Sequence, residues 1–395
     1  MRDQTVLISG ASIAGPALAY WLHRYGFTVT VVERAPALRP GGQAVDFKGR
    51  THLTVLERMG VLDDVRARRT GTTDLVFVDR DGDELGVMRG EFTGGDLEIL
   101  RGDLAEVVYE RTADRVEYLF GDTVTALRDT AEGVHVEFEN APPRTFDLVL
   151  GADGIHSRVR ALAFGPEADY VTHLGHYYCV AGASRWSDAT TPRDRARGYA
   201  HNTPGRLAID GGSKAQQMYM FASPELDYPR NDAAAQRAII ERTFADMGWH
   251  TPRMLADLAE FDDVFLDSIS QVRMDGHYTR GRVALVGDAA YGNTLAGFGT
   301  GLAIVGAYVL AGELATADGD HVTAFAAYDR IMRRYAKIAG NTNAGRFLAP
   351  KTALGIKARN WFISSRLFTL MLKYGDNAAN DIDLIDYPSL IEATR

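Results

Sequence analysis

The sequence of 395 residues contains a single cysteine, Cys179, and has a deficit of positive charge. One cysteine excludes an intramolecular disulfide framework and a cysteine-rich metal site. The 43 Lys and Arg residues are outnumbered by 52 Asp and Glu residues, which gives a formal net charge of −9. We therefore do not expect nucleic acid as the main partner, because phosphate binding needs clustered positive charge.

Long apolar runs are also missing from the sequence. No stretch of about 18 residues lacks charged groups or several polar groups, so no membrane span is expected. The chain begins Met1-Arg2-Asp3-Gln4 and passes straight into an apolar strand, without the features of a secretory signal. These features predict a cytoplasmic protein, and an apolar content of 46% is sufficient for a large core.

The N-terminal segment has the pattern of a β-α-β unit. Its apolar and β-branched residues predict buried strands at 5–9 and 27–33, with a helix at 16–25 between them. The same buried-strand pattern returns much later, at 147–152 and 282–286. We therefore expect these distant segments to belong to one sheet.

The segment 170–271 has a different pattern, in which apolar and polar residues alternate between turns. It predicts an antiparallel sheet with one helix near 233–247. The pair Asp81-Gly82 predicts a further β-hairpin within 75–85. Other helices are expected at 53–59, 104–111, 302–314, 324–338 and 356–373.

This organisation predicts an α/β fold in three parts. A Rossmann-like cofactor-binding domain, with a mixed or parallel sheet and helices, would be discontinuous because its pattern resumes after an interruption. A β-sheet substrate domain and a long C-terminal helix that bridges the two domains would complete the fold. The expected boundaries are 1–71, 100–169 and 272–340 for the first domain, 72–99 and 170–271 for the second, and 341–395 for the C-terminal segment.

The first motif, residues 10–15, is a variant of the dinucleotide-binding fingerprint with Ser12 at a position that Gly usually holds. Gly10 permits the tight turn after the first strand, and the following helix offers free N–H groups to a pyrophosphate. Glu33 ends the second strand, where a carboxylate can bind both hydroxyls of a ribose and disfavours a 2′-phosphate. We predict bound FAD or NAD rather than NADP, with these cofactor-binding residues: Gly10, Ser12, Ile13, Ala14, Gly15, Glu33 and Arg34.

Two later motifs are ambiguous when each is taken alone. Asp153-Gly154 follows one buried strand and precedes Ser157, Arg158 and Arg160. Gly287-Asp288 follows another and precedes a glycine-rich loop at 297–301 and an apolar helix. The purely structural interpretation of the first motif is a capped helix start with solvated arginines. In the second, Asp288 could accept a ligand hydroxyl, and the glycines could bring a helix N-terminus to an anion.

Together and in this order, the three motifs resemble those of the class A flavin-dependent monooxygenases, the family with the p-hydroxybenzoate hydroxylase fold. The resemblance covers about residues 4–340. It implies FAD in an extended form, with Glu33 on the adenosine ribose and Arg101 near the phosphates or the ribitol. It further implies that Asp288 holds the ribityl–pyrophosphate region and that Asp153 bears on both FAD and the nicotinamide cofactor. Gly299, Thr300 and Gly301 would face the edge of the flavin ring.

Within this family, the segment 41–46 (GGQAVD) and the final helix are similar to the tetracycline-inactivating and aromatic polyketide hydroxylase-like enzymes. That similarity implies that Asp46 contacts FAD and that Arg39 contacts the nicotinamide cofactor. The chain departs from the family at two positions of the third motif besides Ser12. Tyr291 stands where the family often has His, and Leu295 stands where it often has a Pro that shapes the loop before the flavin.

The resemblance implies hydroxylation of an aromatic or polyketide-type small molecule by FAD, NADPH or NADH, and O2, through a flavin hydroperoxide. The protein would supply orientation and exclusion of water. No catalytic base is identified, and we expect a monomer or a weak dimer. Two alternatives stay open: a flavin-dependent reductase or dehydrogenase on the same scaffold, and a non-catalytic flavin- or ligand-binding protein.

The remaining candidates have ordinary structural interpretations. The histidines fall at no metal-ligand spacing, so hydrogen-bonded or solvent-exposed roles are expected for His156, His173, His176 and His201, and no metal site is predicted. The final helix is expected to pack across both domains rather than on a membrane. Five aromatic residues could line an apolar pocket or belong to the core: Tyr177, Tyr178, Trp186, Tyr219 and Phe221.

Overall fold

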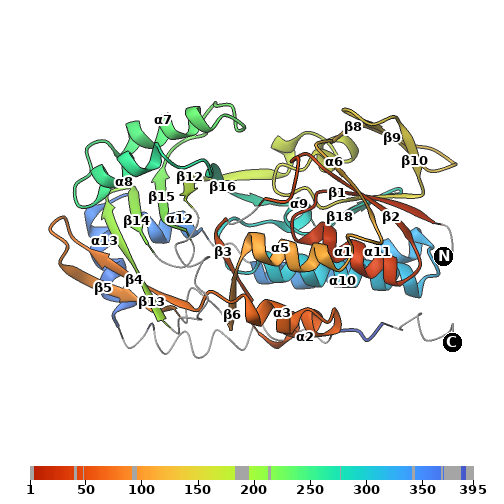
Figure 1. Ribbon diagram of the computed structural model, residues 1–395, viewed down its shortest axis with the longest axis horizontal. Helices are drawn as coiled ribbons and strands as arrows, with labels where there is room; N and C mark the ends of the chain where they lie inside the picture. The colour runs from red at the N-terminus through yellow and green to blue at the C-terminus, as the bar shows by residue number, and fades with distance from the viewer. Residues whose placement is uncertain are drawn as a thin grey trace.

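The computed structural model describes residues 4–39, 42–47, 49–90, 96–182, 195–211, 215–275, 277–339, 343–365, 368 and 384–387. Two large β-sheets lie side by side in it, each with its own helices (Figure 1). This is the α/β architecture that the strand and helix patterns predict.

The first sheet has six strands in the order β17-β18-β11-β1-β2-β7. All of its pairs are parallel except the edge pair between β17 and β18. Its central strands are almost entirely buried, as is usual for parallel strands covered on both faces. The strands are β1 (Thr5–Ser9), β2 (Thr28–Glu33), β7 (Glu117–Phe120), β11 (Leu148–Gly151), β17 (Thr279–Arg280) and β18 (Val283–Leu285).

Helices cover one face of this sheet, and a three-stranded antiparallel sheet lies over the other (Figure 1). The small sheet consists of β8 (Val124–Asp129), β9 (Val134–Phe138) and β10 (Arg144–Phe146), beside α6 (Arg158–Ala163). The helical layer consists of α1 (Ala14–Arg24), α2 (Arg50–Arg58), α3 (Leu62–Ala67), α5 (Arg101–Glu110), α10 (Gly299–Thr316) and α11 (His321–Tyr335), with the short turn η2 (Ala336–Ala339) after it.

Helix α10 is the one helix of the described residues that is long and apolar enough to cross a membrane. It has 18 residues with a mean hydropathy of 1.3, but 78% of this stretch is buried inside the protein. The helix packs against α1, α2 and α11. Its apolar sequence is therefore explained by its place in the core.

A two-stranded antiparallel sheet lies beside the helical layer and was not expected from the sequence. Strand β3 (Ala44–Phe47) pairs with β6 (Leu97–Leu100), which spans the expected domain boundary at 99/100. The pairing brings together segments about fifty residues apart. It places Gln43, just before β3, beside the first residue of α5, with the Arg101 N–H donating to the Gln43 carbonyl at 3.1 Å.

The second large sheet has seven strands in the order β16-β12-β15-β14-β13-β4-β5. Its pairs are antiparallel except for β13 with β4, so the alternating pattern predicted the sheet but not this parallel pair. The predicted hairpin around Asp81-Gly82 is confirmed as β4 and β5. The strands are β4 (Thr72–Val78), β5 (Glu84–Met88), β12 (Val171–Ala181), β13 (Arg195–Thr203), β14 (Arg206–Asp210), β15 (Gln217–Ala222) and β16 (Val264–Val272).

Two helices, α7 (Ala233–Phe244) and α8 (Thr251–Leu258), pack on one face of this sheet. The sequence predicted only one helix here. In the structure, Trp249 lies between α7 and α8 with a φ of +59°, and this left-handed residue separates the two helices. Of the five aromatic candidates, Tyr177, Tyr219 and Phe221 belong to the core under these helices. Tyr178 lies on the opposite face, and Trp186 lies outside the described residues.

The C-terminal part contributes α12 (Ala344–Leu348) and α13 (Ala353–Ile363) to that opposite face. Helix α13 is anchored by Arg359, whose guanidinium lies 3.7 Å from the centre of the Phe77 ring and donates to Asn202 Oδ1 at 2.5 Å. The predicted helix 356–373 thus begins earlier, at 353, and most of its second half lies outside the described residues.

Candidate functional site

The three sequence motifs meet at the carboxyl edge of the parallel sheet. Gly10 directly follows β1, Glu33 ends β2, Asp153 lies just beyond β11, and Asp288 lies just beyond β18. These strands are neighbours in the order β18-β11-β1-β2. Open α/β sheets bind ligands in the crevice outside the carboxyl ends of their strands.

The fingerprint loop depends on two of its glycines. Gly10 has a φ of +104°, and a Cβ atom on it would lie 2.5 Å from the carbonyl oxygen of Ala152. A Cβ atom on Gly15 would collide with the carbonyl oxygen of Gly10. A side chain at Gly10 would therefore push the loop away from the end of β11, and one at Gly15 would push α1 away from the Gly10 turn.

The N-terminus of α1 is free to bind an anion. Its first residue is preceded by Ile13, which makes no side-chain cap, and its first turn contains no acidic residue. Ser12 is half-buried beside it, and its Oγ accepts a hydrogen bond of 2.8 Å from Arg101 Nη2. The serine that replaces the usual glycine therefore holds an exposed guanidinium beside the helix N-terminus, where both favour negative charge.

Glu33 has a second role that the sequence did not reveal. Its Oε2 accepts from the Ala11 N–H and its Oε1 accepts from the Ala35 N–H, both at 2.8 Å. The carboxylate thus fastens the fingerprint loop to the end of β2. A carboxylate offers about four acceptor positions, so it keeps capacity for the predicted ribose hydroxyls. Arg34 and Arg39 nearby in sequence are exposed.

Asp153 is held by protein groups. Its carboxylate accepts from Ser157 Oγ at 2.5 Å and from the Val159 N–H at 3.0 Å. Ser157 in turn caps α6 by accepting from the Arg160 N–H. Burial raises the pKa of Asp153, while these hydrogen bonds lower it. The capped helix start is therefore present, and it fixes the carboxyl group at the sheet edge.

Arg160 corrects the expectation that both arginines of this segment are solvated. Arg158 is exposed, but the side chain of Arg160 is completely buried. Its Nη1 donates to the Ala289 carbonyl at 2.9 Å, and its Nη2 donates to the Ile155 carbonyl at 2.5 Å. One side chain therefore ties the loop after β11 to α9 (Asp288–Tyr291), the helix that begins the third motif.

Asp288 lies at the accessible end of this arrangement. The residue is exposed, yet desolvation by the surrounding protein raises its pKa, and the charge of Arg101 lowers it. The Asp288 carboxylate therefore lies within reach of the charge of Arg101. A Cβ atom on Gly299 would lie 3.4 Å from Asp288 Oδ1, so the glycine loop lies beside Asp288.

The residues of the glycine loop differ in their surroundings. Gly299 and Thr300 are half-buried, but Gly301 is buried against α2, where a Cβ atom would collide with the ring of His52. His52 Nε2 lies 2.8 Å from the hydroxyl of Tyr335, and burial lowers the pKa of this histidine to about 4. Gly301 is thus needed for packing of α10, whereas Gly299 faces Asp288.

The segment that carries the tetracycline-inactivating likeness also reaches this area. Asp46 is half-buried on β3, opposite Glu98 of β6. A Cβ atom on Gly42 would lie 3.8 Å from Arg101 Cβ. The unexpected pairing of β3 with β6 is what brings this segment to Arg101.

The departures at Tyr291 and Leu295 have structural consequences. Tyr291 is buried, and its hydroxyl lies 3.4 Å from the Leu302 carbonyl, inside the core. Leu295 has a φ of +60°. Proline fixes φ near about −65°, so the family's proline could not adopt this backbone conformation. The loop between the third motif and α10 therefore has a conformation of its own in this chain.

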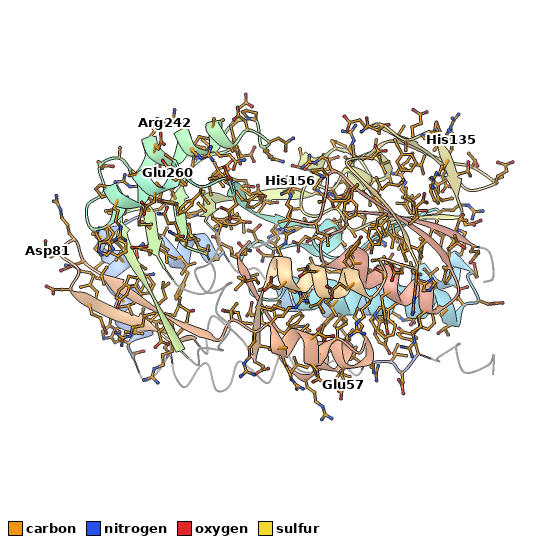
Figure 2. The ribbon with its side chains drawn as sticks, in the orientation of Figure 1. Glu57, Asp81, His135, His156, Arg242 and Glu260 are labelled. Atoms are coloured by element: carbon orange, nitrogen blue, oxygen red, sulfur yellow. The ribbon has the colours of Figure 1, made fainter. Side chains whose placement is uncertain are left out.

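His156, in the loop after β11, connects the six-stranded sheet to the seven-stranded sheet (Figure 2). Its Nδ1 lies 2.9 Å from Glu167 Oε1 on η1 (Glu167–Asp169), and its Nε2 lies 3.0 Å from Asp267 Oδ1 on β16. Both ring nitrogens must carry hydrogen to donate to two carboxylates, so the ring is an imidazolium. Burial opposes this charge, but the bonds to Asp267 and Glu167 outweigh it and raise the pKa of His156 to about 9.

The other histidines have structural roles. His173 Nε2 lies 2.9 Å from the Ser223 carbonyl, and His201 Nδ1 lies 3.1 Å from the Val78 carbonyl. His176 is buried against Gly345 of α12. The hydrogen-bonded role expected for these side chains is confirmed, and sequence alone did not single out His156 among them.

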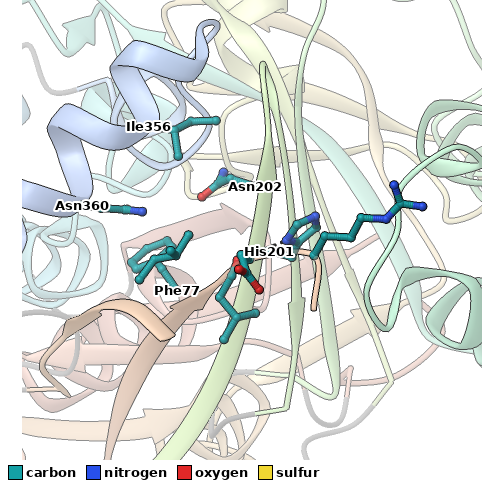
Figure 3. Close-up of a pocket in the computed structure, with 9 residues that line it drawn as sticks. Phe77, His201, Asn202, Ile356 and Asn360 are labelled. Carbon is teal, nitrogen blue, oxygen red and sulfur yellow. Dashed lines mark hydrogen bonds between the residues drawn. The ribbon is translucent and has the colours of Figure 1, made fainter. Parts of the chain in front are cut away.

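A pocket of about 250 Å³ lies elsewhere, between the β4–β5 hairpin, the end of β13 and α13 (Figure 3). Within it, Asp79 Oδ1 accepts from the Asp81 and Asp83 N–H groups at 2.9 Å, so its carboxylate mainly holds the hairpin turn. None of the lining residues is a predicted cofactor residue. They are Phe77, Val78, Asp79, Arg80, Leu85, His201, Asn202, Ile356 and Asn360.

Comparisons with known proteins agree with this geometry. Residues 3–336 match the model of a family described as FAD binding domain. A flavin-dependent monooxygenase from Legionella longbeachae is 36% identical, over 85% of this chain and 86% of that protein. The chain belongs to the class A FAD-dependent monooxygenases.

Two other relatives extend the comparison. An uncharacterized protein from Mycobacterium tuberculosis is 43% identical, over 82% of this chain and 88% of that protein. The crystal structure of tetracycline destructase Tet(51) is 30% identical and superposes with a TM-score of 0.80, covering 98% of this chain and 100% of that chain. This FAD-dependent monooxygenase thus shares its whole architecture with a tetracycline destructase.

The left-handed conformation of Leu295 predicts a difference between two substitutions. Leu295→Gly and Leu295→Pro both remove the leucine side chain, but only proline forbids a φ of +60°. We expect Leu295→Gly to bind FAD normally and Leu295→Pro to lose bound FAD and unfold at a lower temperature. Flavin absorbance of the purified variants and thermal unfolding measure both effects. Wild-type flavin content in Leu295→Pro would show that the loop does not need this conformation.

The charged state of His156 predicts a pH-dependent stability. Its folded-state pKa of about 9 lies above the ordinary value of 6.5, so its contribution is complete below pH 6.5 and is lost as pH rises through 9. His156→Gln should therefore lower the unfolding temperature at neutral pH, and its difference from wild type should shrink above about pH 9. His135→Gln, on β9 far from this junction (Figure 2), is the control. A difference that does not change with pH would contradict the imidazolium assignment.

Proposed function

We propose that this FAD-dependent monooxygenase hydroxylates an aromatic or polyketide-type small molecule, using NADPH or NADH and O2. The observation that supports it most is the arrangement at the carboxyl edge of the parallel sheet, where Arg101 and Asp288 lie beside two helix N-termini without side-chain caps. The likeness to a tetracycline destructase over 98% of the chain favours a polyketide-type substrate, including tetracycline-like molecules.

The chain's own residues fit FAD. Gly10 lets the fingerprint loop cross close to the end of β11, where a Cβ atom would touch Ala152, and so keeps the α1 N-terminus at the sheet edge. The α1 N-terminus and Arg101 supply hydrogen-bond donors and positive charge for phosphate oxygens. Glu33 retains acceptor capacity for a ribose, and Gly299 leaves space beside Asp288.

When bound, FAD supplies the electron transfer and the activation of O2. The protein's part is to bind, orient and exclude water. Ser12 keeps Arg101 aimed at the helix N-terminus. Arg160 keeps the loops that carry Asp153 and Asp288 at a fixed separation. We assign Asp46 and Thr300 to the cofactor-binding set as well, and we assign no residue as a base.

We further propose that the nicotinamide cofactor binds without a domain of its own. The sequence has one dinucleotide fingerprint, and its α1 N-terminus is used by FAD in this proposal. Arg39 is exposed and its guanidinium can grip a phosphate through two parallel hydrogen bonds. The seven-stranded sheet would provide the substrate domain. A cytoplasmic location, as a monomer or weak dimer, is consistent with the use of NAD(P)H.

Labelled oxygen tests the proposed function. The holoenzyme is incubated with NADPH, labelled O2 and a panel of phenols and polyketides that includes tetracycline, and products are analysed by mass. We expect one labelled oxygen atom in the product of at least one panel member. A product without label would indicate the reductase alternative, and peroxide release across the whole panel would contradict hydroxylation of these classes.

Arg39→Ala separates the nicotinamide site from the FAD site in the same assay. Flavin content should be unchanged, because Glu33, Arg101 and the fingerprint loop are intact, while the KM for NADPH should rise by about tenfold or more for a lost charge-assisted phosphate contact. Arg128→Ala is the matched control, since it removes an exposed arginine on β8 that is not assigned to either cofactor. Equal effects of the two substitutions would contradict the assignment of Arg39.

A further inference from the structure

The hydroxyl of Tyr178 has no hydrogen-bond partner in the part of the chain that the structure describes, although the residue is only 7% exposed. Two other buried tyrosines of the same sheet have protein partners. The Tyr177 hydroxyl accepts from the Leu226 N–H, and the Tyr219 hydroxyl donates to Gln217 Oε1, each at 2.8 Å. The Tyr178 hydroxyl oxygen is not one of the fully enclosed atoms without a partner, so it keeps some exposure and can donate to a ligand that binds against the sheet.

Tyr178 lies on the side of the seven-stranded sheet that faces the predicted flavin residues. Besides Asp267, which pairs with it on β16, the charges that act on its hydroxyl include Arg101 and Asp288. Leu295, from the loop after the third motif, packs against the same apolar cluster as Tyr178. Tyr178 therefore lies where the second sheet meets the loop that follows Asp288.

The surroundings of Tyr178 favour an aromatic ligand with an oxygen acceptor. Burial raises the pKa of Tyr178, so its hydroxyl stays protonated at neutral pH and can donate. Phe265 lies next to it on β16, with ring centres 6.1 Å apart at an angle of 63°, and is 40% exposed. An exposed aromatic ring beside a lone donor suits a planar ring system, because aromatic pairs gain from edge-to-face or offset contacts.

We propose that Tyr178 is a specificity-determining residue, whose hydroxyl donates a hydrogen bond to a phenolic, enolic or carbonyl oxygen of the substrate while Phe265 contacts the ring. This inference rests on the proposed function and narrows its substrate class. The donated bond would orient the ring and stabilise negative charge on that oxygen. Ring systems that lack such an oxygen would leave the hydroxyl unsatisfied and would be discriminated against.

The first test needs no substrate. Tyr178→Phe removes a hydroxyl without a partner, so the unfolding temperature of the holoenzyme should stay the same or rise. Tyr219→Phe, the matched control, removes a hydroxyl that serves the buried Gln217 and should lower it by about 2 °C. A loss in Tyr178→Phe as large as that in Tyr219→Phe would show that the hydroxyl is satisfied inside the protein, and would overturn the proposal.

The second test compares 2-naphthol with naphthalene, by perturbation of the flavin absorbance of the oxidised holoenzyme. Wild type should bind 2-naphthol about 5- to 10-fold more tightly, the worth of one hydrogen bond, and Tyr178→Phe should bind both probes equally. Wild type that binds neither probe, or a variant that keeps the preference, would overturn the proposal. These readings do not depend on oxygen transfer, so failure of the labelled-oxygen experiment remains a separate result.

Discussion

The buried guanidinium of Arg160 is the constraint on which the site depends. A charge taken out of water is costly unless protein groups receive its hydrogen bonds. Arg160 donates to the carbonyls of Ile155 and Ala289 and lies 3.9 Å from a carboxylate oxygen of Glu167, while its buried Nε has no partner among the described residues. Ile155 lies in the loop after β11, and Ala289 lies in α9, which follows the neighbouring strand β18. Because one rigid guanidinium serves both segments, the carboxyl groups of Asp153 and Asp288 are held at a fixed separation.

The same network continues into the second sheet. Glu167, next to Arg160, also accepts from His156, and His156 reaches Asp267 on β16. Asp267 is the cross-strand partner of Tyr178. A line of charged contacts therefore runs from the cofactor edge of one sheet to the inner face of the other. A shift of either sheet would separate partially buried charges, which opposes independent movement of the two sheets.

The sequence predicted the features that local geometry determines. Gly10 and Gly15 can be recognised because only glycine fits these turns, and Glu33 because the end of β2 follows at a regular spacing. It did not predict the pairing of β3 with β6, which joins segments about fifty residues apart, or the bond from Arg101 to Ser12 that this pairing allows. Nor does a sequence tell that Arg160 is buried while Arg158 is exposed, since that depends on what packs against α6.

The two ends of the site are therefore built differently. The cofactor end consists of backbone turns, helix N-termini and glycines, which tolerate few residue types, and this explains why motifs are visible there. The proposed substrate end consists of side chains on strands, where Tyr178 and Tyr177 are equally aromatic in sequence but point to opposite faces. The loop at Leu295 lies between the two ends, in a backbone conformation of about 1–3 kcal/mol higher free energy than usual. Such strain persists only when surrounding contacts stabilise it, and the contacts of Leu295 are with the cluster that contains Tyr178. The departure from the family pattern thus occurs where the loop after the third motif meets the seven-stranded sheet. In the proposed function, a different substrate would require a different conformation of the loop at this place.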